Sequence, residues 1–364
     1  MNIFVFGSSI VSSYWNGAAT YYRGIYKALH ALGHHITFAE PDAYGRQQKR
    51  DAGDYSYVES LVYAPCRDLD AMLRRASQAD LVIKHSGIGV DDEELELRVL
   101  ECQPQASVAF WDVDAPATIA RMNENPQDAF PRAIPRYDAV LTYGGGPEIE
   151  RHYRSYGARV FASIYNGLDS DTHHPVAADP SLTSDLAFIG NRLPDRERRV
   201  EDLFLLAAKL APEKQFLLGG EGWGDKALPP NVRWVGHVPT TDHNRVNCSA
   251  AMVLNINRAS MATFGFSPPT RVFEVAGSGS CLLCDDWPGV EECFKPGKEI
   301  LVIRSAQDVV DCLRNHDQTS ARILGQALRA RALRDHTYMQ RARVLDDLLR
   351  DNFHLSGTAE RQLA

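Results

Sequence analysis

The stretch SPPTRVFEVAGSGSCLLCDDWPGVEECFKPGKEI, residues 267–300, decides the fold that this sequence predicts. Its first residues are typical of a helix start, because Ser267 is a good N-cap and Pro268 suits the first helical position. The glycines of GSGS then end the helix, and the apolar run CLLC predicts a buried strand. Such a helix followed by a buried strand is typical of parallel sheets wrapped by helices.

The same alternation of apolar runs and amphipathic stretches recurs along the chain and predicts two such sheets. In the first half, the predicted strands are residues 3–7, 35–40, 80–85, 107–112 and 138–144, with a helix over 18–32. In the second half, they are residues 185–190, 215–220, 231–236, 251–256, 281–284 and 300–303. Ser305 and Asp308 predict a capping box, and the tail from about 320 to 349 has a helical pattern.

We therefore expect an α/β protein of two doubly wound, Rossmann-like domains that face each other across a cleft, with C-terminal helices. The predicted domains are residues 1–172 and 184–330. The segment 169–184, rich in proline and small polar residues, is the predicted linker. Residues 331–364 are predicted to be helical and to pack back toward the first domain.

Length and composition agree with this organisation and exclude several classes of function. A chain of 364 residues is longer than one hydrophobic core usually supports, and 44% hydrophobic with 24% charged residues is typical of a soluble globular protein. The net charge of -8 predicts no overall attraction to nucleic acid or anionic lipid. We see neither a signal peptide nor an apolar run of the roughly 20 residues that a membrane helix needs, so we expect a cytoplasmic protein.

The seven scattered cysteines predict reduced thiols rather than a disulfide framework. Cys281 and Cys284 form a C-x-x-C motif, but it lies in an apolar run with no second pair nearby. We interpret them as buried packing residues, with a metal or redox role as the alternative.

The helix start in the opening stretch also predicts an anion site, most naturally for a phosphate, because bare N–H groups point outward there. Arg271 lies near that end, and Glu274 lies one turn further along on the same face. Phosphate would repel Glu274, so we expect its carboxylate to serve another part of the ligand, and a ribose diol offers two donors. The alternative is a capped helix with a surface ion pair.

Several segments, taken in order, carry a family resemblance: FWDVDAPAT, YNGLDSDTHHP, DLAFIGNRLPDRERRVEDLFL, FLLGGEGW, RWVGHVPTTD, VLNINR and the stretch quoted first. In this order the chain resembles the two-domain GT-B glycosyltransferases and, within them, the CgeB-like spore-maturation glycosyltransferases. The resemblance covers most of the chain. It implies an N-terminal acceptor domain, a C-terminal domain that holds a nucleoside diphosphate sugar, and transfer of that sugar, a hexose, to an acceptor hydroxyl.

The resemblance also implies roles for individual residues. Glu274 matches the second glutamate of the family's E-x7-E pattern, which binds the donor ribose, whereas the first glutamate would fall at Phe266, so the pair is incomplete. The other implied donor-binding residues are Ser267, Thr270 and Arg271 at the helix start, Gly190, Asn191, Arg192 and Arg196 near the diphosphate, and Gly236, His237 and Val238 beside the nucleobase. The alternative for the arginines is a solvated helix start.

Polar residues after the first-half strands are the catalytic candidates. Asp112 and Asp114 can orient or deprotonate an acceptor hydroxyl, and the alternative is an Asx-type turn. His85 can bind a donor phosphate or an acceptor group, or it is a structural histidine. Asn16 and Gly17 lie in a loop that faces the cleft in GT-B enzymes, and the glycine would let substrate approach the backbone.

We expect no metal ion and no cofactor other than the donor, because Asp285 and Asp286 are adjacent and GT-B enzymes generally work without a metal. The resemblance favours retention of stereochemistry. No Lys-Ser or Lys-Thr pair follows the glycines at 144–146, and GSSIVS lacks G-x-G-x-x-G, so a nucleoside triphosphatase and a nicotinamide-dependent dehydrogenase are disfavoured. Two alternatives stay open: a GT-B nucleotide-sugar epimerase and a non-catalytic nucleotide- or carbohydrate-binding module. The acceptor and the oligomeric state are not predicted.

Overall fold

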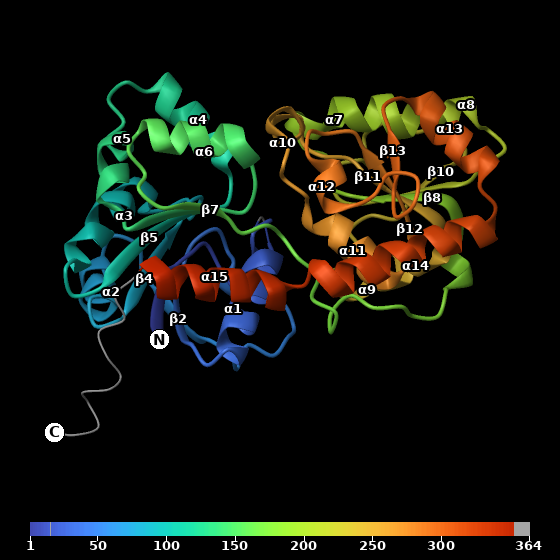
Figure 1. Cartoon of the computed structure of the whole chain (residues 1–364). Helices are drawn as coiled ribbons and strands as arrows, with labels where there is room; N and C mark the ends of the chain where they lie inside the picture. Colours follow the sequence, from blue (N-terminus) through green and yellow to red (C-terminus); the bar gives the residue numbers. More distant parts are fainter. Residues whose placement is uncertain (15, 353–364) are drawn as a thin grey trace. The chain divides into compact units, whose positions relative to one another are not determined.

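The computed structural model describes residues 1–14 and 16–352 and consists of two compact units (Figure 1). Unit 1 contains Met1–Tyr165 and the C-terminal segment from Tyr338, and unit 2 contains Asn166–Thr337. The chain therefore passes between the units at two points, after Tyr165 and after Thr337. The segment 169–184, which the sequence predicts as the linker, lies within unit 2.

Unit 1 contains a seven-stranded sheet in the order β3-β2-β1-β4-β5-β6-β7, with parallel pairing throughout. Its elements are β1 (Asn2–Phe6), α1 (Ala19–Ala31), β2 (His35–Pro41), η1 (Gln47–Lys49), β3 (Glu59–Tyr63), α2 (Leu69–Ala76), β4 (Leu81–His85), α3 (Asp92–Arg98), η2 (Val99–Cys102), β5 (Ser107–Asp112), α4 (Ala115–Glu124), α5 (Phe130–Ala133), η3 (Ile134–Arg136), β6 (Ala139–Thr142), α6 (Gly146–Ser155), β7 (Phe161–Ser163) and α15 (Tyr338–Asn352). The two edge strands, β3 and β7, are not predicted by the sequence pattern, because neither is a continuous buried run.

Unit 2 contains a six-stranded parallel sheet in the order β10-β9-β8-β11-β12-β13. Its elements are η4 (Pro180–Leu182), β8 (Ser184–Ile189), α7 (Pro194–Val200), η5 (Glu201–Leu205), α8 (Leu206–Leu210), β9 (Phe216–Gly219), β10 (Val232–Trp234), α9 (Thr240–Ser249), β11 (Ala250–Asn255), α10 (Ala259–Phe264), α11 (Thr270–Ser278), β12 (Cys281–Asp285), α12 (Val290–Cys293), β13 (Leu301–Ile303), α13 (Ala306–Asn315) and α14 (Gln318–Asp335). The predicted doubly wound α/β architecture is confirmed in both units.

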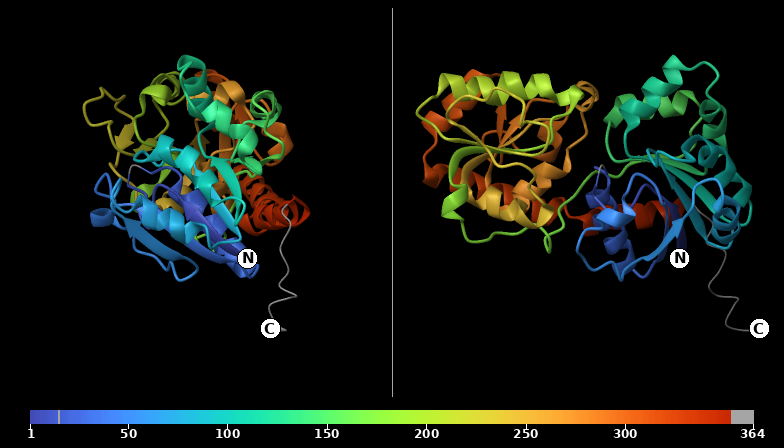
Figure 2. Two further views of the ribbon diagram at one scale, coloured as in Figure 1. Left: turned by 90° about the vertical axis from the view of Figure 1, so that its left-hand side faces the viewer. Right: turned by 180° about the vertical axis from the view of Figure 1, so that it is seen from behind.

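Helices cover both faces of each sheet, as the views in Figures 1 and 2 show for unit 2. There, α7, α8 and α13 bury one apolar cluster, and α11 and α14 bury another on the opposite face. In unit 1, α1 and α15 share a cluster with β1, β2 and β4. Because helices pack on both faces of each sheet, central strands such as β4 and β12 are buried along their whole length.

The predicted C-terminal helical tail consists of two helices, since α14 ends at Asp335 and α15 begins at Tyr338. Backbone pairing interrupts the helix here: the Leu168 amide donates to the His336 carbonyl over 2.7 Å, and Leu168 forms a parallel bridge with Thr337. The capping box of Ser305 and Asp308 is confirmed. Residues 353–364 of the predicted tail lie outside the described part of the chain. Across the described helices, none is both long enough and apolar enough to cross a membrane.

Candidate functional site

The strand order of unit 2 reverses between the neighbouring strands β8 and β11. In open parallel sheets, ligands bind at this point, beyond the carboxyl ends of the strands. The loop that begins at Gly190 follows β8, and the segment that leads to α11 follows β11. The fold therefore brings the residues predicted to bind the donor diphosphate to one edge of this sheet.

The two loops that follow β8 and β9 approach each other closely. The Gly190 amide donates to the Gly219 carbonyl over 2.8 Å, and Trp223 Nε1 donates to the Gly190 carbonyl over 2.8 Å. Gly220 has a φ of +120°, and a Cβ there would lie 2.3 Å from the Gly190 oxygen. Asn191 Oδ1 accepts from the Glu221 amide over 3.0 Å. Gly190 and Asn191 thus hold the backbone of this edge in place.

Three arginines gather at the same edge. Arg196 donates through Nη2 to the Asn191 carbonyl over 2.5 Å, and the guanidinium carbons of Arg196 and Arg271 lie 5.7 and 5.2 Å from the ring centre of Phe188. Burial, together with the positive charges of Arg271 and Arg258, lowers the pKa of Arg196 to about 9. An arginine with a pKa this low marks a cluster in which positive charge is poorly compensated, which is the property of an anion site.

Arg258 belongs to this cluster although the sequence analysis did not select it. Its Nε donates to Asp195 Oδ2 over 3.0 Å, and it lies shortly after β11, at the N-cap of α10. The signal that could have found it is its position after the strand that adjoins β8. Arg192, by contrast, forms ion pairs of 2.8 Å with both Glu197 and Asp225, which raise its pKa. The predicted contact of Arg192 with a diphosphate would have to compete with these two carboxylates.

The start of α11 differs from the prediction in one respect. The N-cap is Pro269 and the first helical residue is Thr270, so the prediction that Ser267 caps the helix is wrong. The sequence Pro-Pro-Thr favours this later start, since Pro269 has the extended conformation of an N-cap. Ser267 is buried before the helix. The N-cap residue Pro269 makes no side-chain capping hydrogen bond, and Arg271 lies in the first turn.

Glu274 lies one turn further along α11 and is 8% exposed. Its Oε2 lies 3.1 Å from Nδ1 of His243 in α9, and Nε2 of that ring lies 3.3 Å from the Val238 carbonyl. Burial alone would raise the pKa of Glu274, but His243, then His173 and Arg271, hold it well below its usual range. Glu274 is therefore ionised.

The predicted nucleobase loop is joined to this carboxylate through His243. Gly236 has a φ of +73°, and its carbonyl accepts from the Gly220 amide over 2.7 Å. Val238 is buried, whereas His237 is exposed. Unit 2 thus brings together the loop at 236–238, Glu274, Arg271 and Arg196.

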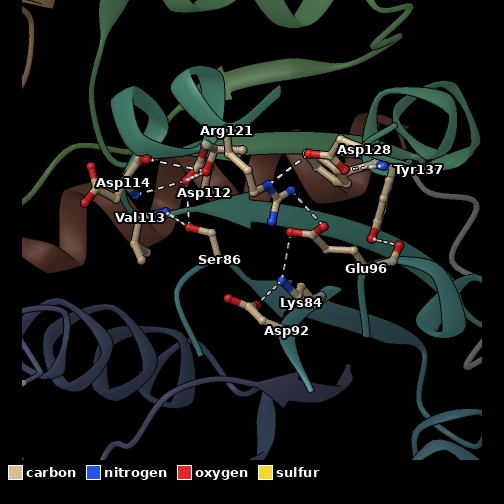
Figure 3. Close-up of polar contacts among 12 residues, drawn as sticks. Lys84, Ser86, Asp92, Glu96, Asp112, Val113, Asp114, Arg121, Asp128 and Tyr137 are labelled. Atoms are coloured by element: carbon tan, nitrogen blue, oxygen red, sulfur yellow. Dashed lines mark hydrogen bonds and ion pairs between the residues drawn. The ribbon is translucent and has the colours of Figure 1, made fainter. Parts of the chain in front are cut away.

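In unit 1, Asp112 ends β5 and is fully buried (Figure 3). Its Oδ1 accepts from Ser86 Oγ, the Asp114 amide and Thr118 Oγ1 over 2.6, 2.9 and 3.1 Å, and its Oδ2 accepts from Tyr153 over 2.5 Å. Burial raises the pKa of Asp112. The bond to the Asp114 amide is the Asx-type turn that the sequence analysis held open as the alternative.

A chain of buried ion pairs runs beneath this turn (Figure 3). The fully buried Lys84 pairs with Asp92 and, over 3.4 Å, with Glu96, which also pairs with Arg121 over 2.8 Å. Burial raises the pKa of Glu96. These pairs tie β4, which ends at the candidate His85, to α3 and to α4, which begins after the candidate Asp114. Asp114 itself is the N-cap residue of α4 and is partly exposed.

His85 ends β4 inside an aromatic cluster. Its Nε2 lies 2.5 Å from the hydroxyl of Tyr26, and its ring centre lies 4.5 Å from that of Tyr22 and 5.2 Å from that of Trp111. Burial lowers the pKa of His85 to about 3, so the ring is neutral at physiological pH. This environment is that of a structural histidine, which the sequence analysis held open.

The loop after β1 contains the last two predicted site residues. Asn16 is buried, donates through Nδ2 to the carbonyls of Ser9 and Ser12 over 2.7 and 3.0 Å, and accepts from Ser8 Oγ over 2.9 Å. These bonds fold the loop on itself. Gly17 is exposed, and a Cβ there would meet no atom within 4 Å. Its backbone is therefore accessible to a ligand.

Within residues 1–14 and 16–352, no group of three or more His, Cys, Asp or Glu side chains could hold a metal ion. Cys281 and Cys284 are buried free thiols. Asp285 pairs with Arg199 over 2.7 Å, and Asp286 pairs with Arg304 over 2.7 Å. Both adjacent aspartates are thus engaged by arginines.

Residues 196–347 match a family model described as glycosyl transferase-like. No curated protein matches the sequence closely enough to count as a relative. Solved structures match along nearly the whole chain. Sucrose-phosphate synthase from Thermosynechococcus elongatus superposes with a TM-score of 0.67 at 15% identity, covering 96% of this chain and 98% of its own.

HepE of Anabaena in complex with UDP-glucose has a TM-score of 0.65 at 11% identity, covering 96% of this chain and 99% of its own. A glycosyltransferase from Rickettsia africae has a TM-score of 0.67 at 11% identity; the match covers 98% of this chain and 99% of that glycosyltransferase. At these identities the similarity shows the fold. The chain therefore has the two-domain GT-B fold, with glycosyl transferase-like sequence over residues 196–347.

Proposed function

We propose that the protein transfers a sugar from a nucleoside diphosphate sugar to an acceptor hydroxyl. The observation that carries this proposal is the cluster of Arg196 in α7, Arg258 at the start of α10 and Arg271 in the first turn of α11. The ionised Glu274 lies one turn after Arg271 in α11. A diphosphate would compensate the positive cluster, and the carboxylate would accept from the two ribose hydroxyls. The loop at 236–238 would bracket the nucleobase through its backbone.

Stabilisation of the leaving group is the mechanism that this arrangement supports. As the bond between sugar and diphosphate breaks, negative charge grows on the departing nucleoside diphosphate. Guanidinium groups and helix amides that are already in place stabilise that charge without reorganisation. Arginine suits this task because its planar fork binds two phosphate oxygens at once.

The finer assignments rest on the sequence resemblance. It favours a CgeB-like, retaining and metal-independent hexosyltransferase that acts in the cytoplasm. The complexes of HepE of Anabaena with UDP-glucose, and with UDP and glucose, support a hexose as the first sugar to test and UDP as the first nucleotide.

On the acceptor side, Asp112, Asp114 and His85 remain the candidates. The four hydrogen bonds of Asp112 and the burial of His85 favour supporting roles for these two side chains. Asp114 is the partly exposed member of the set, and we place the contact with the acceptor there.

A panel of nucleotide sugars, incubated with the protein with and without candidate acceptors, tests the proposal. Chromatography would quantify the nucleoside diphosphate, the donor sugar and any glycosylated acceptor. Release of nucleoside diphosphate with formation of a glycoside supports the transferase. Epimerised donor without release would identify a nucleotide-sugar epimerase, and binding without turnover would identify a binding module.

A further inference from the structure

The proposed function leaves His243 without a role, although its ring joins two of the regions that would hold the nucleoside. His243 lies in α9, and 18% of its side chain is exposed. One ring nitrogen faces the Glu274 carboxylate of α11 over 3.1 Å, and the other faces the Val238 carbonyl over 3.3 Å. A single side chain thus links the carboxylate proposed to bind the ribose to the loop proposed to bracket the base.

Both partners of His243 are hydrogen-bond acceptors. A peptide carbonyl can only accept, and so can an ionised carboxylate. Glu274 is ionised, because nearby positive charge overcomes the effect of burial on its pKa. A neutral imidazole donates from one nitrogen only, whereas an imidazolium donates from both. The ring can therefore donate to both partners at once only in its protonated form, and to either one of them when it is neutral.

A second histidine lies beside the ring of His243. His173 packs against His243 with ring centres 6.3 Å apart and planes inclined by 27°. Burial lowers the pKa of His173. Among the described residues, none donates a hydrogen bond to Glu274 Oε1, so that oxygen is left for a ligand.

We propose that His243 is a positioning residue for the nucleoside part of the donor. Through Nδ1 it holds Oε2 of Glu274, which directs the carboxylate toward the ribose diol, and through Nε2 it fixes the Val238 carbonyl beside the nucleobase. This inference rests on the proposed function and deepens it. The diphosphate, which the arginine cluster would hold, should be independent of His243.

Isothermal titration calorimetry on the full chain tests this separation of roles. The ligands are UDP, GDP, dTDP and inorganic pyrophosphate. His243→Ala should weaken binding of the preferred nucleoside diphosphate at least tenfold and change pyrophosphate affinity less than twofold. His243→Gln, whose amide can still donate to Glu274, should recover part of the affinity. Arg245→Ala, in the same helix but exposed and paired with Asp242 and Asp179, is the matched control and should bind like the wild type.

A double-mutant cycle asks whether His243 acts through Glu274. Glu274→Ala alone should weaken nucleotide binding. In the Glu274→Ala protein, the further substitution His243→Ala should weaken nucleotide binding much less than the same substitution does in the wild-type protein. Fully additive effects would overturn the inference. So would equal nucleotide affinity in His243→Ala and wild type, or a loss of pyrophosphate binding that parallels the loss of nucleotide binding, because the latter identifies a purely structural role.

Failure of the proposed function has a different signature. In that case the wild-type protein binds none of the three nucleoside diphosphates and no pyrophosphate, and both proposals fall together. Circular dichroism of each variant verifies that α9 and the rest of the fold are intact. If His243→Ala does not fold, the comparison of His243→Gln with wild type decides the question by the same criteria.

Discussion

Replacing Arg196 with Met should make the ligand-free protein more stable and, at the same time, remove most of its stabilisation by nucleoside diphosphate. Arg196 lies beside Arg271 and Arg258, and burial together with these charges holds its pKa at about 9. The repulsion among these three guanidinium groups therefore lowers the free energy of unfolding until an anion binds. Methionine keeps an apolar stem of similar length against Phe188 without the charge.

The expected gain in the free energy of unfolding of Arg196→Met is the difference between a stabilising and several opposing contributions. A pKa of about 9 lies roughly three and a half powers of ten below that of an ordinary arginine, so the charge on Arg196 costs at most about 5 kcal/mol of unfolding free energy. Solvent reaches part of the side chain, Asp195 and Asp285 offset part of the repulsion, and the variant loses the 2.5 Å bond to the Asn191 carbonyl. That bond is worth about 1 kcal/mol. We expect a net gain of about 1 kcal/mol in the free energy of unfolding of unit 2.

The pH dependence has a definite sign. The pKa of Arg196 is lower in the folded than in the unfolded protein, so above pH 9 the unfolded chain binds the proton more tightly. Wild-type stability contributed by this group therefore rises as the pH increases beyond about 9. The advantage of Arg196→Met should be largest near pH 7 and shrink toward pH 10.

Urea denaturation with and without nucleoside diphosphate measures both effects. At about 100 times the dissociation constant, the ligand should stabilise the wild type by about 2.7 kcal/mol and the variant by much less. Arg198→Met, an exposed position of the same helix, is the control and should behave like the wild type in both measurements. A variant that is less stable than wild type and still fully stabilised by nucleotide would refute the assignment of an anion site.

Three further predictions concern the framework. Gly220→Ala should destabilise unit 2 by about 2 kcal/mol or more in thermal or urea unfolding, because its φ of +120° and the nearby loop carbonyl leave no room for a Cβ, whereas Gly17→Ala should be neutral. Lys84→Met leaves the buried Glu96 without its partner in β4 and should cost about 3 kcal/mol of unfolding free energy at pH 7; a loss below 1 kcal/mol would contradict a tightly coupled pair. His85 has a pKa of about 3 in the folded protein, so the unfolded chain binds its proton first and stability should fall as the pH drops from about 6.5 toward 3. His85→Gln should flatten this fall, and an unchanged pH profile would show that other groups cause it.

The candidate site was predictable to the extent that it depends on the ends of parallel strands. Arg196 and Arg271 follow neighbouring strands, so their approach could be expected from the sequence. Arg258 was missed although it follows β11, the neighbour of β8, as Arg271 does. His243 was missed because nothing in its spacing relates it to the other residues of the site. Arg192 was expected at the diphosphate, but its partners Glu197 and Asp225 lie in a helix start and a loop whose approach the sequence does not reveal.

The strands at the centre of each sheet could be recognised from the sequence because both of their faces are buried, and such strands must be continuous apolar runs. The edge strands β3 and β7 could not, since half-buried strands lack that run. The break after Asp335 likewise depends on pairing with Leu168, a residue far away along the chain. Local sequence therefore specifies which segments are buried, whereas the partners of charged groups and the ends of helices depend on contacts that exist only after the chain has folded.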